Sequence, residues 1–275
     1  MSTTRLSAPP SRSVLTTDLA ESVVPAPESL RPWLTELGHI PTGTDVSAPF
    51  THVPQTTTTI VLRAERSGRR DALVLGPQTR AVYSVTDEPA GCTRLRLAPG
   101  ATARLLGVPA VDLADRVLRL TDLPGPAADL APDLTELDPR EIFPFLESAL
   151  PHLLSEHPAE RAHRRLLHTA TAALATAPVH AVAAHLAVSE RQLRNLFTAG
   201  IGVSPKHFAR IDRVRSVLAH AGDTPWAQVA AASGYYDQSH MTADFRSLMG
   251  TTPAGYRSGK LPAPTACRAL GRSSS

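Results

Sequence analysis

One sequence pattern occurs twice toward the C-terminal end of the chain, and the two copies lie 48 positions apart. The copies cover 179–208 and 227–256 and align without a gap. The paired positions include Ser189 with Asp237, Phe197 with Phe245, Gly202 with Gly250 and Pro205 with Pro253. Each copy reads as a short helix, a tight break, a second helix that begins at a capping residue, and a Gly-x-[Ser/Thr]-Pro exit, which is the layout of a helix-turn-helix. Two copies at a fixed spacing predict one domain that binds two neighbouring segments of DNA.

Length and composition are those of a soluble protein with about two domains. The chain has 275 residues, of which 42% are apolar, as in ordinary globular proteins. No run approaches the roughly 20 apolar residues of a membrane span, and the N-terminus lacks the apolar segment of a secretion signal. The two cysteines, Cys92 and Cys267, are too few for a disulfide framework or a cysteine zinc site. We expect a cytoplasmic protein that does not enter a membrane.

Charge is distributed unevenly along the chain. Residues 161–258 hold 11 Lys and Arg against 5 Asp and Glu, together with seven histidines. Residues 120–160 hold nine acidic residues against Arg140 alone. A basic block behind an acidic one indicates where a polyanion would bind and where it would not.

The local patterns predict an α+β chain. Short β-branched or alternating runs at 56–64, 71–76, 80–85 and 92–97 are typical of strands. In the last of these, Leu95 and Leu97 alternate with Arg94 and Arg96, which predicts one buried face and one solvent-exposed face. Helical segments follow at 101–107 and 109–120.

These patterns divide the chain into five segments. They are a disordered tail at 1–20, a small β-rich sensor or dimerisation domain at 21–120, an acidic, proline-rich linker with a helix at 121–160, the double helix-turn-helix domain at 161–258, and a disordered tail at 259–275.

The first recognition helix is predicted at 189–200. Ser189 and Gln192 form a capping box, S-x-x-Q. Leu193, Leu196 and Phe197 have the spacing of an inward face. Arginine and asparagine can make paired hydrogen bonds to base edges, and the N-terminal half of the second helix is the part that meets the bases. The candidate base-reading residues are Arg191, Gln192, Arg194 and Asn195.

The second recognition helix is predicted at 237–249, with Asp237 as its cap and Met241, Phe245 and Leu248 facing inward. Its outward face carries less charge than the first, which predicts weaker readout. The candidate base-reading residues here are Gln238, Ser239, His240 and Thr242.

A helix over 204–222 is predicted to join the two units and to fix their spacing. Ser204 caps it, Pro205 suits its first turn and Gly222 ends it. Basic residues that lie off its apolar stripe, or near the end of the second unit, are candidates for phosphate contacts, which position a protein on DNA without reading sequence. They are Lys206, Arg210, Arg213, Arg215, Arg246 and Arg257.

The segment GYYDQSHMTADFRSLMGTTPAGYR (234–257) carries a long and specific motif, and through it residues 161–258 resemble the DNA-binding domain of the AraC/XylS family of bacterial transcriptional regulators. In that family the position of Ala243 often holds Arg or Lys, so the resemblance implies that one common contact is missing here. VLGPQTRAVY (74–83) and residues 94–125 resemble a small β domain that precedes this module in actinobacterial regulators. The resemblance implies a cupin-like N-terminal domain that binds an effector or mediates dimerisation.

We therefore expect a sequence-specific transcriptional regulator that is not an enzyme and has no cofactor. Its partner is double-stranded DNA, with RNA polymerase, a small-molecule effector and a second copy of the chain as further candidates. The main alternative makes the N-terminal domain a metal-binding or enzymatic cupin-like module, but His39 and His52 are isolated and no His-x-His pair is present. A binder without sequence preference would need mainly Lys, Arg and aromatic residues. An N-terminal domain that only dimerises also fits the sequence.

Overall fold

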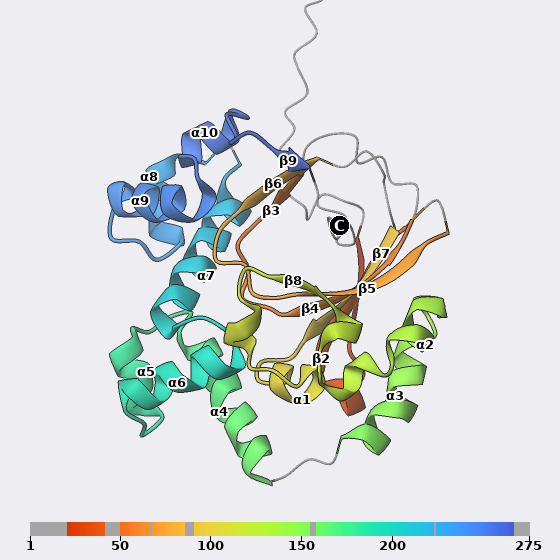
Figure 1. The fold of residues 1–275 in the computed structure, drawn as a ribbon. Coiled ribbons are helices and arrows are strands. Elements are labelled where there is room, and N and C mark those ends of the chain that lie inside the picture. The colour runs from red at the N-terminus through yellow and green to blue at the C-terminus, as the bar shows by residue number, and fades with distance from the viewer. Residues whose placement is uncertain are drawn as a thin grey trace, which may run out of the picture.

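The structure is a computed structural model in which residues 21–41, 50–65, 68–85, 91–154, 158–222 and 224–266 are described. An N-terminal β-sheet region is followed by helices that cover it, and a helical domain lies beside it (Figure 1). The α+β class predicted from the sequence is confirmed. The predicted tail at 1–20 lies outside the described residues.

The N-terminal region contains two sheets. The larger is antiparallel, in the order β1 (Ser22–Pro25), β2 (Leu34–Ile40), β7 (Gly91–Leu97), β4 (Thr59–Ala64), β5 (Arg70–Leu75) and β8 (Val117–Arg119). The smaller joins β3 (Phe50–His52), β6 (Val82–Val85) and β9 (Thr265–Ala266), the last of which runs parallel to β6. Strands β4 to β7 fall where the sequence predicts strands.

Helices cover one face of the larger sheet. They are α1 (Thr102–Leu106), α2 (Ala131–Glu136), α3 (Ile142–Leu153) and four 3-10 turns at Glu28–Leu30, Ala110–Leu113, Leu120–Asp122 and Pro126–Ala128. Leu95 and Leu97 belong to the core beneath them. Arg94 and Arg96 point to the other face, as their alternation predicts, but their side chains are only 19% and 22% exposed. That face is therefore only partly open to solvent, and it lines a cavity.

Three segments differ from their prediction. The helix predicted at 109–120 is wrong after Leu113, because Asp115 takes a left-handed conformation (φ 57°) and the chain then pairs with β5 as β8. The acidic segment 121–160 does not run free between domains. Leu134, Leu146 and Leu150 pack into the core of the sheet, because leucines at helical spacing between the prolines supply an apolar face. In the predicted tail at 259–275, the described part carries β9.

In its described residues, the C-terminal domain consists of seven helices in two units. They are α4 (Pro158–Ala173), α5 (Val179–His185), α6 (Glu190–Gly200), α7 (Pro205–His220), α8 (Trp226–Ala232), α9 (Gln238–Met249) and α10 (Pro253–Arg257). One core joins α4, α5 and α6 around Phe197, and a second joins α7, α8 and α9 around Phe245. The repeated unit is thus three helices long, and α4 stands to the first unit as α7 stands to the second.

Candidate nucleic-acid interface

The first recognition helix, α6, begins at a complete capping box. The Gln192 backbone N–H donates to the Ser189 hydroxyl at 3.1 Å, and the Ser189 backbone N–H donates to the Gln192 side-chain oxygen at 2.8 Å. The turn before it contains Ala187 at φ 53°. This left-handed conformation is unfavourable in free energy for any residue with a Cβ atom. The cap occupies the amide oxygen of Gln192, so any contact of this side chain with a base would have to use its NH2 group.

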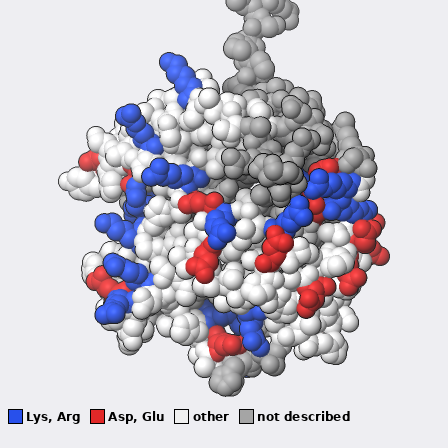
Figure 2. All heavy atoms as spheres, viewed as in Figure 1, with Lys and Arg blue, Asp and Glu red and all other residues white. Residues whose placement is uncertain are grey.

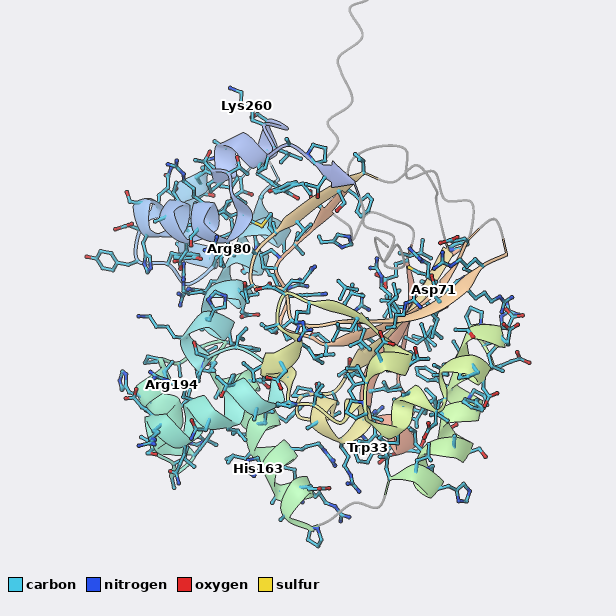
Figure 3. All side chains as sticks on the ribbon, in the orientation of Figure 1. Trp33, Asp71, Arg80, His163, Arg194 and Lys260 are labelled. Atoms are coloured by element: carbon cyan, nitrogen blue, oxygen red, sulfur yellow. The ribbon has the colours of Figure 1, made fainter. Side chains whose placement is uncertain are left out.

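The outward face of α6 has the side chains that the sequence placed there. Leu193, Leu196 and Phe197 are buried, while Arg191, Gln192, Arg194 and Asn195 are exposed. In Figure 3, Arg194 lies on the outer side of the first unit, away from the sheets. The structure brings the four candidate base-reading residues onto one exposed surface, and their contact with DNA stays a prediction.

The second recognition helix, α9, is capped by Asp237, whose carboxylate accepts from the His240 backbone N–H at 2.7 Å. Gln238, Ser239 and His240 are exposed and Thr242 is half-buried. A shallow groove runs along this face. It is lined by Gln238, Ser239, Thr242, Ala243, Arg246, Ser247 and Thr252. The His240 ring packs edge-on against Tyr235, with 5.3 Å between ring centroids, and therefore lies at the margin of this face.

A buried ion-pair cluster that is absent from the predictions above fastens α9 to α7. The Asp244 carboxylate lies 2.8 Å from the Arg210 guanidinium and 3.5 Å from that of Arg213. Burial, followed by the charge of Asp244, raises the pKa of neighbouring Tyr235 to about 12. The equivalent position in the first unit is Leu196, which packs in its core. The sequence does contain a signal for this cluster: Asp244 is an acidic residue between Met241 and Phe245, on the inward face of a helix.

The candidate phosphate contacts divide into two groups. Lys206, Arg215, Arg246 and Arg257 are exposed, but among the described residues no internal partner is shown for Lys206 and Arg246. The others have partners within the protein. Arg210 and Arg213 pair with Asp244, Arg257 lies 4.3 Å from the centre of the Trp226 ring, and Arg215 donates to the Pro54 carbonyl at 3.3 Å. Lys206 and Arg246 are consequently the better candidates for phosphate contacts.

Basic side chains gather along the edge of the molecule formed by the C-terminal domain, whereas acidic side chains are numerous over α2 and α3 on the opposite edge, below a further group of basic side chains (Figure 2). This arrangement agrees with the charge blocks in the sequence. It gives DNA an electrostatic preference for the edge on which α6 and α9 lie.

Both units contact the N-terminal region. At the first unit, the Gly100 backbone N–H donates to the Gly200 carbonyl at 3.1 Å. At the second, the Ala81 backbone N–H donates to the Leu248 carbonyl at 2.8 Å. There the Tyr83 hydroxyl also donates to the Met249 carbonyl at 2.7 Å, and burial raises the pKa of Tyr83 to about 12. The N-terminal region therefore holds the two units in place together with α7.

A cavity of about 580 Å3 lies between the polar face of the larger sheet, β3 and α7. Its walls include His52, Arg94 and Arg96, and α7 contributes Arg215. The volume is within the range of small-molecule sites. Within the described residues, no group of three or more His, Cys, Asp or Glu side chains is placed to hold a metal ion.

The half-buried His52 makes the stability of the protein depend on pH. Burial, and then the charge of Arg94, lower its pKa from 6.5 to about 4. A His whose pKa is lower in the folded state stabilises the fold above pH 6.5, and this contribution is lost as the pH falls from 6.5 toward 4. We expect a loss of about 2–3 kcal/mol from this group. Urea unfolding at pH 7 and pH 4.5 should show a smaller difference for His52→Asn than for the wild type; an equal difference would contradict this assignment.

A family comparison agrees with the helix-turn-helix geometry of the C-terminal domain. Residues 182–259 match the family model of a helix-turn-helix domain. The fold and this match define the C-terminal part as a helix-turn-helix DNA-binding domain. More particularly, the match spans both units and includes the motif at 234–257 through which the domain resembles the AraC type. No curated protein matches the chain significantly.

Solved structures that match parts of the chain at low identity were also found. An AraC-type transcriptional regulator from Chromobacterium violaceum is 20% identical, with 36% of this chain and 96% of that chain covered and a TM-score of 0.32. The C-terminal domain of AraT, a response regulator from Geobacillus stearothermophilus, is 22% identical, with 37% and 87% covered and a TM-score of 0.33. ToxT from Vibrio cholerae O395 is 10% identical, with 76% and 91% covered and a TM-score of 0.38.

Among the helices of the described residues, none is long and apolar enough to span a membrane.

Proposed function

We propose that the protein is a sequence-specific transcriptional regulator that reads two adjacent major-groove segments with α6 and α9. The observation that carries this proposal is a pair of capped helices, each with an exposed N-terminal half, held by separate cores in one domain of the matched family. The second helix of a helix-turn-helix presents this half to base edges.

The two units contribute unequally to recognition in this proposal. The face of α6 carries Arg191, Arg194 and Asn195, which can make paired hydrogen bonds to guanine and adenine. The face of α9 carries Gln238, Ser239 and Thr242 beside Ala243. Specificity therefore rests mainly on α6, while α9 sets the register.

Arg194→Ala is expected to weaken binding by about 1–3 kcal/mol and to relax base preference at one position, because an exposed arginine on this face reads a base. A site is first selected from random DNA with the full-length chain. Affinity for that site and for its single-base variants is then measured at several salt concentrations.

Lys206→Ala is the matched control, since Lys206 is an exposed cation at the start of α7. It is expected to weaken binding to all sequences alike and to reduce the salt dependence by about one counterion. If both variants lost affinity equally on selected and random DNA, the base-reading role of Arg194 would be wrong. A full-length chain with no salt-sensitive DNA binding would overturn the function.

We further propose that the N-terminal region binds an effector in its cavity. The support is the position of the cavity, since α7 forms part of its wall through Arg215 and also belongs to the core of the second unit. A ligand there would touch the helix that joins the two DNA-reading units.

A further inference from the structure

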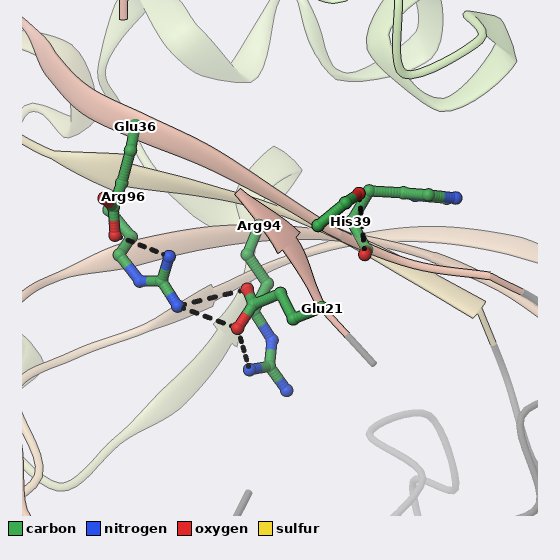
Figure 4. Close-up of polar contacts among 6 residues, drawn as sticks. Glu21, Glu36, His39, Arg94 and Arg96 are labelled. Carbon is green, nitrogen blue, oxygen red and sulfur yellow. Dashed lines mark hydrogen bonds and ion pairs between the residues drawn. The ribbon is translucent and has the colours of Figure 1, made fainter. Parts of the chain in front are cut away.

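The carboxylate of Glu21 occupies the arginine-lined part of the cavity. Its two oxygens each lie 3.1 Å from the same Arg96 nitrogen, and one lies 3.7 Å from Arg94 (Figure 4). The Glu21 side chain is only 8% exposed. An internal carboxylate thus sits in a position that two arginines from β7 define.

Gly38 leaves the space that this carboxylate needs. It lies opposite Arg94 in the register of β2 and β7. A Cβ atom at position 38 would stand 1.9 Å from a Glu21 oxygen. Any side chain there would force the carboxylate aside, and this would be cheap because the end of a glutamate is flexible.

The charge and the walls of the cavity favour an anion with polar groups. Three arginines, Arg94, Arg96 and Arg215, face two glutamates, Glu21 and Glu36. Glu36 pairs with Arg96 at 2.7 Å, so Glu21 is the only carboxylate shown in contact with Arg94 among the described residues. His52 stays neutral beside Arg94 because its pKa is about 4. The remaining walls carry many hydroxyl and amide groups, from Gln55, Thr56, Thr57, Thr59 and Gln78.

We propose that the cavity binds a small hydroxylated organic carboxylate, and that its carboxylate takes the place of Glu21 on Arg94 and Arg96. This inference rests on the effector role proposed above and names the class of ligand. The hydroxyls of the ligand bond to the threonine and glutamine side chains. Glu21 is then an internal competitor, which keeps the two arginines neutralised while the ligand is absent.

The test uses gluconate as the probe and sorbitol as its neutral counterpart, because the two differ chiefly in the carboxylate. Decanoate supplies a carboxylate without hydroxyls. Calorimetric titration of the full-length chain without DNA, at matched ionic strength, is expected to show binding of gluconate and none of sorbitol. Removing one charge-assisted contact with Arg94→Met should weaken gluconate binding about tenfold. Arg119→Met, an exposed arginine of β8, should leave it unchanged.

Two variants at the position of the internal competitor give the sharper result. Glu21→Gln is expected to bind gluconate several-fold more tightly than the wild type. Gly38→Ala should weaken gluconate binding, because its Cβ atom would stand 1.9 Å from the position that the ligand carboxylate takes over from Glu21. Thermal unfolding of each variant confirms that it is folded.

Gluconate binding that ignores Arg94→Met, or that is no tighter in Glu21→Gln, would overturn the proposal. So would no binding of gluconate to Glu21→Gln, or tighter binding of decanoate than of gluconate. DNA affinity measured on the same wild-type preparation without gluconate tests the regulator function separately. A failure there with intact gluconate binding would leave the cavity assignment standing and remove the regulatory role.

Discussion

Gly202→Ala is expected to destabilise the protein by about 2–4 kcal/mol, clearly more than the same substitution at Gly250. The two glycines occupy equivalent positions in the two units and both take left-handed conformations, with φ of 91° and 69°. The conformational cost of a Cβ atom, about 1–2 kcal/mol, is therefore shared. They differ in what surrounds them.

At Gly202 the N-terminal region approaches the backbone closely. A Cβ atom there would lie 2.7 Å from the Ala110 carbonyl oxygen and 2.8 Å from a ring carbon of Pro77. At Gly250 the nearest atom would be a ring carbon of Pro262 at 3.4 Å, an ordinary contact. Relief of the first clash requires the first unit to move away from the sheet region, which also opens the Gly100–Gly200 hydrogen bond.

The measurement is urea unfolding of the two single variants beside the wild type. DNA affinity should fall further for Gly202→Ala, because the first unit carries the arginines proposed to read bases. Equal losses of stability in the two variants would show that the contact with the N-terminal region contributes nothing.

The same pair of glycines shows what the sequence could and could not predict. Their place in the repeat predicts the exits of both units, and the caps at Ser189 and Asp237 follow from local patterns that depend on a few neighbouring residues. The close approach of Ala110 to Gly202 joins positions far apart in the chain, and no local pattern contains it.

The N-terminal region shows the same limit. The alternation in β7 predicts correctly which side chains share a face, because strand geometry fixes this. It does not predict that the arginine face lines a cavity, since that depends on β3, α7 and Glu21. Strands β1, β2 and β3 lacked a predicted counterpart, and β8 lay within a predicted helix, because pairing with β5 and a left-handed residue outweigh local helical preference.

In the candidate interface, helical spacing predicts the outward residues of α6 and α9 and their burial pattern. Helical spacing does not distinguish basic side chains that face solvent from those that form ion pairs within the protein. Arg210 and Arg213 lie off the apolar stripe of α7, which is why they are candidates for phosphate contacts. Their partner Asp244 lies on another helix, and only the packing of α9 on α7 brings the charges together.

Asp244→Ala is expected to destabilise the second unit by about 2–3 kcal/mol, because it leaves two half-buried arginines facing a gap where a buried carboxylate had neutralised them. Asp244 is 8% exposed, while the arginine side chains are 27% and 32% exposed and remain partly solvated, which keeps the loss below that of a fully buried pair. Asp212→Ala, which removes an exposed carboxylate from α7, is the matched control and should change stability little.

A double-mutant cycle separates the ion pair from general damage to α9. Since Arg210 makes the shorter contact, Asp244→Ala should cost clearly less in an Arg210→Ala background than in the wild type, with a coupling of about 1 kcal/mol or more by urea unfolding. Additive losses would show that Asp244 contributes through packing alone. Because the pair fixes α9 against α7, Asp244→Ala should also weaken binding to the selected DNA site while the preference read by Arg194 persists. The two separate cores imply that the two units recognise DNA separately. A variant that lost the preference read by Arg194 as well would contradict this.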